Sequence, residues 1–295
     1  MIDFTALGIG INPHGAAEQR VDCPRCARSR RDEALGVNAE TGAFHCFRCG
    51  YKGRAGGDTT APRPIVRIDD PAVAERKRER LRVACRETVA LNHPKAHAVR
   101  SYLQARALAE ILKDPPVTLR AHPGLEYWDG HTRLGKYPAM VAIFRGASGQ
   151  PVTLHVTYLR HDGCAKASVP APKKILGVPM RGATRGGAIR LYEPRRGVLG
   201  IAEGIESALS LHLIAKIPTW ASFCADNLER IKLPAGLREL QIGVDLDESG
   251  KGRAVAEALV KRVKRWSPRT RCAFITPEVE GFGDLNDELL KRGVC

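Results

Sequence analysis

The sequence VLGIAEG at residues 198–204 decides the fold of the C-terminal third, because a short apolar run ends there in Glu203 and a glycine. An apolar run of this length, closed by a turn signal, is typical of a buried strand. The segments 219–223, 239–244 and 271–275 have the same character, and helical patterns at 204–216 and 252–266 lie between them. Strands that alternate with helices predict an α/β fold with a doubly wound parallel sheet.

Acidic side chains follow two of these strands. Glu203 lies just past one strand and Asp245 just past another, with Asp247 two residues further on. Ligands of open α/β sheets bind at the carboxyl ends of strands, and carboxylate oxygens suit Mg²⁺. We therefore predict a catalytic magnesium site at Glu203, Asp245 and Asp247, with Asp284 as a further catalytic candidate. Helix capping is the alternative for Asp247 or Asp284 taken singly.

Four of the nine cysteines form two C-x-x-C pairs, Cys23 with Cys26 and Cys46 with Cys49. Two such pairs can complete a tetrahedron of thiolates around one ion, which predicts a structural Zn²⁺ site. A redox C-x-x-C motif is the alternative, but it would begin a helix in a βαβ unit, and that context is absent.

The chain of 295 residues carries a net charge of +15, which suits a polyanionic partner such as nucleic acid. Basic proteins also bind membranes incidentally, but no stretch reaches the roughly 20 apolar residues of a membrane span. The N-terminus lacks the basic region of a signal peptide. The other five cysteines are scattered, as in a reducing compartment. We expect a cytoplasmic protein without a membrane partner.

The segment before the sheet mixes helices and strands. Residues 58–70 contain Pro62 and Pro64 and are predicted to be a linker, followed by a basic helix at 71–91 and a second helix at 97–112. Two β-like runs, 140–144 and 153–159, are separated by a turn signal at 146–149 and predict a hairpin.

With these motifs in place, residues 197–291 resemble a TOPRIM domain, the catalytic fold of bacterial-type primases, topoisomerases and some nucleases. The family's glutamate corresponds to Glu203, its paired aspartates to Asp245 and Asp247, and a third acidic motif to the segment DLND at 284–287. The segment FHCFRCG at 44–50 resembles the primase zinc-binding domain, and the middle region resembles the basic subdomain of phage- and plasmid-type primases. Glu206 stands where an aspartate is commoner in the family, so it is either a metal ligand or a surface residue of the helix.

The resemblance implies a DNA primase, a DNA-templated RNA polymerase that makes short primers on single-stranded DNA by Mg²⁺-dependent nucleotidyl transfer. Basic residues that the family places before the TOPRIM domain would bind the phosphates of the NTPs: Arg160, Lys166, Lys173, Lys174 and Arg181. The zinc ribbon would hold the template, with Phe47 or Tyr51 as platforms for bases, although Phe47 could equally pack in the ribbon's own core. No P-loop sequence follows residue 291, which implies a stand-alone primase of a phage or mobile element that works with a separate helicase.

Two rival functions use the same residues. A TOPRIM nuclease or topoisomerase-like enzyme would need the carboxylates without a triphosphate site, and a zinc-dependent DNA-binding accessory protein would need no catalysis at all. The predicted organisation is a multi-domain α/β protein. Its parts are a zinc ribbon at 1–57, a linker with basic helices at 58–116, a basic α+β subdomain of the polymerase core at 117–191 and a TOPRIM domain at 192–295.

Overall fold

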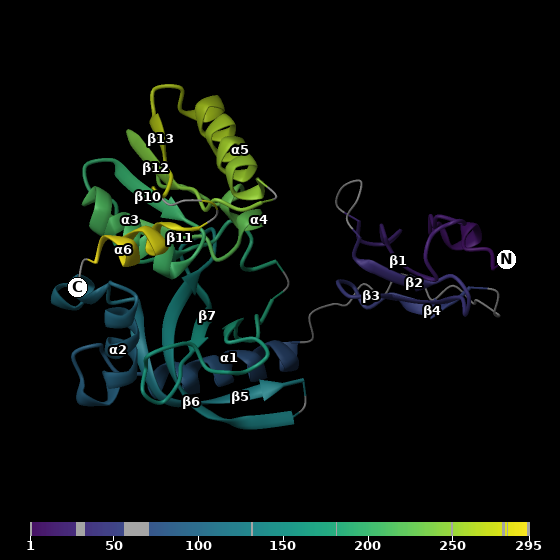
Figure 1. The fold of residues 1–295 in the computed structure, drawn as a ribbon, viewed down its shortest axis with the longest axis horizontal. Coiled ribbons are helices and arrows are strands. Elements are labelled where there is room, and N and C mark those ends of the chain that lie inside the picture. The colour runs from purple at the N-terminus through teal and green to yellow at the C-terminus, as the bar shows by residue number, and fades with distance from the viewer. Residues whose placement is uncertain are drawn as a thin grey trace. The chain divides into compact units, whose positions relative to one another are not determined.

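Figure 1 shows the computed structural model of the chain, which describes residues 2–27, 33–55, 71–130, 132–180, 182–248, 250–278, 281 and 283–293. The chain forms two compact units, residues 1–68 and 69–295. The predicted linker and Arg181 lie outside the described residues. The three segments predicted to follow the zinc ribbon fall almost wholly within the second unit, and the boundaries at 117 and 192 stay predictions.

The first unit is a small antiparallel sheet in the order β1-β2-β3-β4. Its strands are β1 (Glu18–Val21), β2 (Leu35–Asn38), β3 (Ala43–Cys46) and β4 (Lys52–Arg54), preceded by a single turn, η1 (Thr5–Leu7). Its buried core consists of only a few side chains, among them Phe4, Leu35 and Phe44, packed around Cys23 and Cys46. A core this small needs a metal or another cross-link for stability.

The larger unit contains a second antiparallel sheet, in the order β5-β6-β7-β8. Its strands are β5 (Leu119–Asp129), β6 (Thr132–Arg145), β7 (Pro151–Tyr158) and β8 (Lys173–Ile175). The pairing of Ile143 with Leu154 confirms the predicted hairpin. Three register pairs with β7 give the short strand β8 a fixed place in this sheet.

The two helices before this sheet are shorter than predicted. The first, α1 (Pro71–Arg86), ends because Val89 exchanges backbone hydrogen bonds with Ala121 at the start of β5. The second, α2 (His97–Ala105), follows the turn η2 (Pro94–Ala96) and ends before the turn η3 (Ala109–Lys113). Ala107 adopts a left-handed φ of 55°, which breaks the helix. Both endings result from contacts or backbone geometry that helical periodicity does not encode.

The C-terminal part of this unit is a five-stranded sheet in the order β13-β12-β10-β11-β9. The strands β10 (Val198–Ala202), β11 (Thr219–Ala221), β12 (Glu239–Gly243) and β13 (Arg271–Ile275) run parallel, and the edge strand β9 (Ile189–Arg190) is antiparallel. The connecting helices are α3 (Ile205–Ala215), α4 (Ala225–Leu228), α5 (Lys251–Trp266) and α6 (Leu285–Arg292). The helices α3 and α5 pack into different cores on the two faces, so the predicted doubly wound sheet is confirmed.

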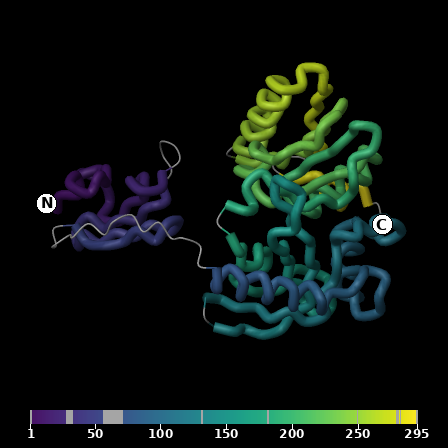
Figure 2. The backbone as a smooth tube through the Cα atoms, turned by 180° about the vertical axis from the view of Figure 1, so that it is seen from behind, coloured from purple at the N-terminus to yellow at the C-terminus, as the bar shows by residue number. Residues whose placement is uncertain are grey.

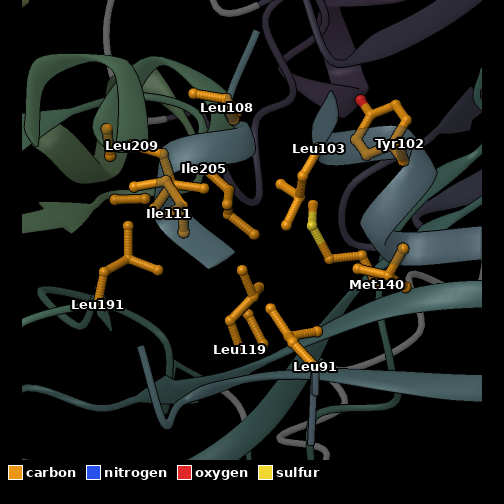
Figure 3. Close-up of a cluster of buried hydrophobic side chains, with 14 of the residues drawn as sticks. Leu91, Tyr102, Leu103, Leu108, Ile111, Leu119, Met140, Leu191, Ile205 and Leu209 are labelled. Carbon is orange, nitrogen blue, oxygen red and sulfur yellow. The ribbon is translucent and has the colours of Figure 1, made fainter. Parts of the chain in front are cut away.

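Figure 2 shows the larger unit from behind, with the parallel sheet in green above the antiparallel sheet in teal. One hydrophobic core joins the two sheets. Figure 3 shows Tyr102 and Leu103 of α2, Met140 of β6, and Ile205 and Leu209 of α3 in this core. The shared core fixes the start of α3 against the segments that precede the parallel sheet.

Within the described residues, no helix combines the length and the apolar character that crossing a membrane requires.

Candidate carboxylate cavity and four-cysteine centre

Three acidic residues from separate parts of the parallel sheet line one cavity of about 190 Å³. Glu203 directly follows β10, Asp245 lies two residues after β12, and Asp284 directly precedes α6. The cavity is also lined by residues of the preceding segments. Its other lining residues are Arg106, His155, Lys166, Lys173, Ile189, Gly204, Ile205, Glu206, Ser207 and Phe223. The site thus lies at the carboxyl edge of the sheet, where open α/β folds bind ligands.

Asp245 is under electrostatic strain in this cavity. Burial raises its pKa to about 7, and the negative charges of Asp284 and Glu203 add to the rise. Burial also raises the pKa of Glu203, although the positive charges of Lys251 and Lys173 oppose the rise. Asp245 Oδ1 is buried and has no hydrogen-bond partner among the residues that the structure describes. Clustered carboxylates with an unsatisfied oxygen fit a divalent cation, which would relieve the repulsion.

Asp247 and Asp284 both act as helix caps, as the capping alternative predicts. Asp247 accepts hydrogen bonds from the backbone N–H groups of Lys251 (3.3 Å) and Gly252 (3.0 Å) at the start of α5. A side chain at Gly252 would collide with the carbonyl oxygen of Asp245, so glycine permits this close approach. Asp284 forms a capping box with Asp287 at the start of α6.

Capping does not remove the two aspartates from the site. Asp284 lines the cavity while it caps α6, and the charge of Asp247 contributes to the raised pKa of Glu203. In the described part of the chain, the four cysteines are the one group whose ligand atoms all lie within 4.8 Å of one another. Glu203, Asp245 and Asp284 thus line one cavity, and Asp247 acts on it through its charge.

The five predicted phosphate-binding residues occupy different places. Lys166 and Lys173 line the cavity with the carboxylates. Lys174 lies on the opposite face of β8, where its Nζ donates to the Trp128 carbonyl and lies 3.7 Å from the centre of the Tyr127 ring. Arg160 is exposed and pairs with Asp162 at 2.8 Å. Arg181 lies outside the described residues.

The interpretation of Glu206 as a surface residue of the helix is wrong. Its side chain is only 4% exposed. Oε1 accepts a hydrogen bond from the Tyr102 hydroxyl at 2.7 Å, and Oε2 lies 3.2 Å from Lys173 Nζ. The partners are more than 30 positions away along the chain, and the sequence around residue 206 does not predict them.

His155 is a cavity residue that sequence reasoning missed. It is 5% exposed, its Nδ1 has no partner among the described residues, and burial lowers its pKa to about 4. The ring is therefore neutral at physiological pH. The sequence does contain a sign of this cavity, because the polar residues Thr153, His155 and Thr157 alternate along one face of β7. The structure shows that all three are buried. A polar face on a buried strand predicts a polar cavity.

The four cysteines of the first unit form a compact centre. The sulfurs of Cys23 and Cys49 lie 3.7 Å apart, and those of Cys26 and Cys46 lie 3.5 Å apart. A tetrahedron with Zn–S bonds of about 2.3 Å has edges of roughly 3.8 Å, so the spacing fits zinc. Burial acts to raise the pKa of Cys46, but the backbone N–H groups of Cys49 and Arg48 outweigh it and bring the pKa to about 7. Burial raises the pKa values of Cys23 and Cys26, so a bound cation would be needed to deprotonate the thiols of the cluster together.

The two aromatic residues predicted to stack on bases differ in their exposure to solvent. Phe47 is 64% exposed, with the Arg20 guanidinium 4.1 Å from its ring centre and His45 at 4.8 Å. Tyr51 is buried in the core and packs against Phe44. Of the two, Phe47 is thus the ring that is accessible from solvent, and Tyr51 stabilises the fold.

Comparisons with known proteins agree with this architecture. Residues 198–294 match the family described as Toprim domain, and residues 75–186 match a family described as a domain of unknown function, DUF7146. No curated protein matches the chain.

Among solved structures, a DnaG primase catalytic domain bound to single-stranded DNA is 14% identical to this chain. The match covers 76% of this chain and 77% of that chain, at a TM-score of 0.50. The primase fragment of the bacteriophage T7 primase-helicase protein is 12% identical over 94% of this chain and 95% of that chain, at a TM-score of 0.40. The zinc-binding and RNA polymerase domains of the Aquifex aeolicus primase are 13% identical. The match covers 99% of this chain and 80% of that chain, at a TM-score of 0.40.

Residues 198–294 are therefore a Toprim domain, and Glu203, Asp245 and Asp284 belong to it. The chain has the fold of the DnaG-type primase catalytic domain, preceded by a four-cysteine ribbon.

Proposed function

We propose that this protein is a DNA primase that synthesises short RNA primers on single-stranded DNA. The observation that carries the proposal is the cavity that the Toprim carboxylates of Glu203, Asp245 and Asp284 share with Lys166 and Lys173. Carboxylates alone would serve a nuclease equally well, but two ammonium groups in the same cavity provide a binding site for a triphosphate. The fold shared with a DnaG primase catalytic domain supports the same reaction.

Glu203, Asp245 and Asp247 would hold Mg²⁺, and Asp284 completes the acidic edge of the cavity. When bound, Mg²⁺ supplies charge neutralisation for the triphosphate and the leaving pyrophosphate and activates the primer 3′-hydroxyl. Lys166 and Lys173 would contact the phosphate oxygens in the same cavity, where their positive charges attract the incoming NTP. The neutral ring of His155 adds a polar wall without adding charge.

The ribbon would present the template. Zn²⁺ held by Cys23, Cys26, Cys46 and Cys49 stabilises its small core. Phe47 offers an exposed ring for stacking on a base, and Arg20 beside it offers a positive charge to the phosphate backbone. Lys174 and Arg160, which lie elsewhere, would contact nucleic acid or the outer phosphates of the NTP.

The cellular setting belongs to the same proposal. A primase of phage or mobile-element type acts in the cytoplasm and supplies primers at a replication fork that a helicase opens. The net charge of +15 suits a protein that follows single-stranded DNA.

Incubation of the full chain with single-stranded DNA, labelled NTPs and Mg²⁺ tests this proposal. We expect labelled oligoribonucleotides that require both template and divalent cation. Shortening of the DNA without incorporation of label would instead assign the cavity to a nuclease. Binding of DNA with neither outcome would identify an accessory protein.

A further inference from the structure

Glu206 lies in the first turn of α3, three residues beyond Glu203, and contacts three side chains from the preceding segments. The Tyr102 hydroxyl donates to Oε1 at 2.7 Å, Lys173 Nζ lies 3.2 Å from Oε2, and Lys166 Nζ lies 3.8 Å from Oε1. The Glu206 side chain is almost fully buried, whereas the lysines are 35% and 40% exposed. One carboxylate thus anchors two ammonium groups that reach into the cavity.

The charge balance of this cluster is positive. Two ammonium groups share one carboxylate, which leaves one positive charge unmatched within the cluster. A buried carboxylate is costly unless it is paired, and here the attraction of Lys173 and Lys166 overcomes burial and holds the pKa of Glu206 at about 2. The pairing keeps both ammonium groups in place and still leaves net positive charge for an anion.

The same contacts argue against Glu206 as a metal ligand. Both of its oxygens already face groups that carry protons, and a divalent cation would approach a cluster of net positive charge. Glu203 and Asp245 differ, because their pKa values are raised and Asp245 Oδ1 has no partner among the described residues. The two acidic residues at positions 203 and 206 therefore do different work.

Lys173 has alternative partners within electrostatic reach. Its positive charge lowers the pKa values of both Glu203 and Asp245 against the effect of burial. Lysine side chains are flexible, so an ammonium group without Glu206 would turn toward these carboxylates. Such ion pairs would occupy the oxygens that a metal ion needs.

We propose that Glu206 is a positioning residue that holds Lys166 and Lys173 for the triphosphate of a Mg²⁺-bound nucleotide and prevents Lys173 from pairing with Glu203 and Asp245. The inference rests on the proposed function in taking a nucleoside triphosphate as the ligand. Its effect on metal binding is independent of primer synthesis.

Binding of Mn²⁺ to the zinc-loaded full chain, followed by electron paramagnetic resonance, tests the metal-binding part. Glu206→Gln keeps the shape and removes the charge, and we expect Mn²⁺ to bind about tenfold more weakly. Replacing Lys166 and Lys173 by Met in the same chain should restore the affinity to within about twofold of the wild type. Unchanged affinity in Glu206→Gln, or a loss that the lysine replacements do not reverse, would overturn the inference.

Primer synthesis supplies the second readout. Glu206→Gln should raise the KM for NTPs about tenfold at saturating Mg²⁺ and change kcat less than threefold. Glu206→Asp keeps the charge but shortens the side chain by one methylene. Its KM for NTPs should lie between the values of the wild type and Glu206→Gln. Glu206→Asp also provides the test if the glutamine variant does not fold. Glu288→Gln is the matched control, because Glu288 is equally buried, pairs with Arg292 and lies on α6.

The outcomes separate the two proposals. An active wild type whose KM and Mn²⁺ affinity do not respond to Glu206→Gln overturns this inference and leaves the primase assignment intact. A wild type that makes no primer contradicts the primase assignment. If Mn²⁺ affinity still falls in Glu206→Gln and recovers when both lysines are replaced, Glu206 is retained as the anchor of the lysine pair.

Discussion

Asp245 is held in the folded protein at a cost in stability. Its carboxylate is buried beside Glu203 and Asp284, and one of its oxygens has no partner in the described part of the chain. Strain of this kind is common at functional sites, where a ligand offsets it. The geometry therefore predicts opposite effects of one substitution on stability and on activity.

Asp245→Asn should raise the stability of the protein by about 1 kcal/mol at pH 8 without added divalent cation, because it removes a buried like-charge repulsion. The same change should abolish primer synthesis. Urea unfolding monitored by circular dichroism measures the first effect. A variant that is less stable than the wild type would show that the carboxylate is not strained.

His155 predicts a dependence of stability on pH. Its pKa is about 4 in the folded protein and about 6.5 in the unfolded chain. A lowered histidine pKa means that the stabilisation is fully present above pH 6.5 and is lost as pH falls toward 4. The loss from this group amounts to about 3 kcal/mol at most.

His155→Gln should therefore flatten the stability profile between pH 6.5 and 4, measured by urea unfolding at a series of pH values. His161, which is exposed, provides the control, and His161→Gln should keep the wild-type slope. An unaltered slope in His155→Gln would refute the assignment of the buried neutral ring.

Residue-level prediction from the sequence succeeded where chemistry follows a local pattern. The Toprim motif identified Glu203 and Asp245, and both line the cavity. It failed for Glu206, whose partners Tyr102, Lys166 and Lys173 are distant in the sequence, and it missed His155, whose burial depends on the packing of two sheets. Local spacing reports which face a residue occupies, but not what covers that face.

At the scale of elements, the start of α5 connects the fold to the site. Gly250 adopts a left-handed φ of 64° as the N-cap residue, and the Asp247 side chain accepts hydrogen bonds from the first turn. The helix thus fixes Asp247 beside the cavity, and its positive N-terminal end stabilises the carboxylate.

Two substitutions at Asp247 separate capping from charge. Asp247→Asn retains an oxygen that accepts hydrogen bonds from the start of the helix. The melting temperature of this variant should therefore match that of the wild type, while its primer synthesis falls at least tenfold. Asp247→Ala should also lose about 1 kcal/mol of stability, because the cap is gone. Thermal unfolding and labelled-primer yield measure the two effects. If Asp247→Asn makes as much primer as the wild type, Asp247 acts as a helix cap and its charge is not needed for synthesis.

Element boundaries show the limit of periodicity. The strands β10, β12 and β13 agree with the sequence prediction to within a residue, because each is a short apolar run with clear ends. The helices α1 and α2 end five and seven residues early, at Arg86 and Ala105 rather than 91 and 112. Val89 leaves the helix to pair with Ala121, a choice that tertiary contacts decide.

At the scale of the whole molecule, the two compact units have different sources of stability. The larger unit has extensive cores joined across two sheets, whereas the ribbon has a few buried side chains around its cysteines. Loss of the metal should consequently affect one unit and spare the other.

Cys46→Ser should release the zinc ion and unfold the ribbon while the larger unit keeps its melting transition. Metal analysis by mass spectrometry and differential scanning calorimetry measure these effects in the full chain. Template-dependent initiation should fall further than extension of a pre-annealed primer. Cys164→Ser, at an exposed cysteine outside the cluster, should leave zinc content unchanged. A wild-type protein without zinc would contradict this account of the ribbon.

The central claim is that the Toprim cavity catalyses template-directed synthesis of RNA. Its most direct test compares incorporation of labelled ribonucleotides on single-stranded DNA by the wild type, by Asp245→Asn and by Glu257→Gln, whose substituted side chain lies exposed on α5. The account predicts primers from the wild type and from Glu257→Gln, and a loss of at least a hundredfold in Asp245→Asn with DNA binding retained. Equal primer yield from Asp245→Asn would contradict it.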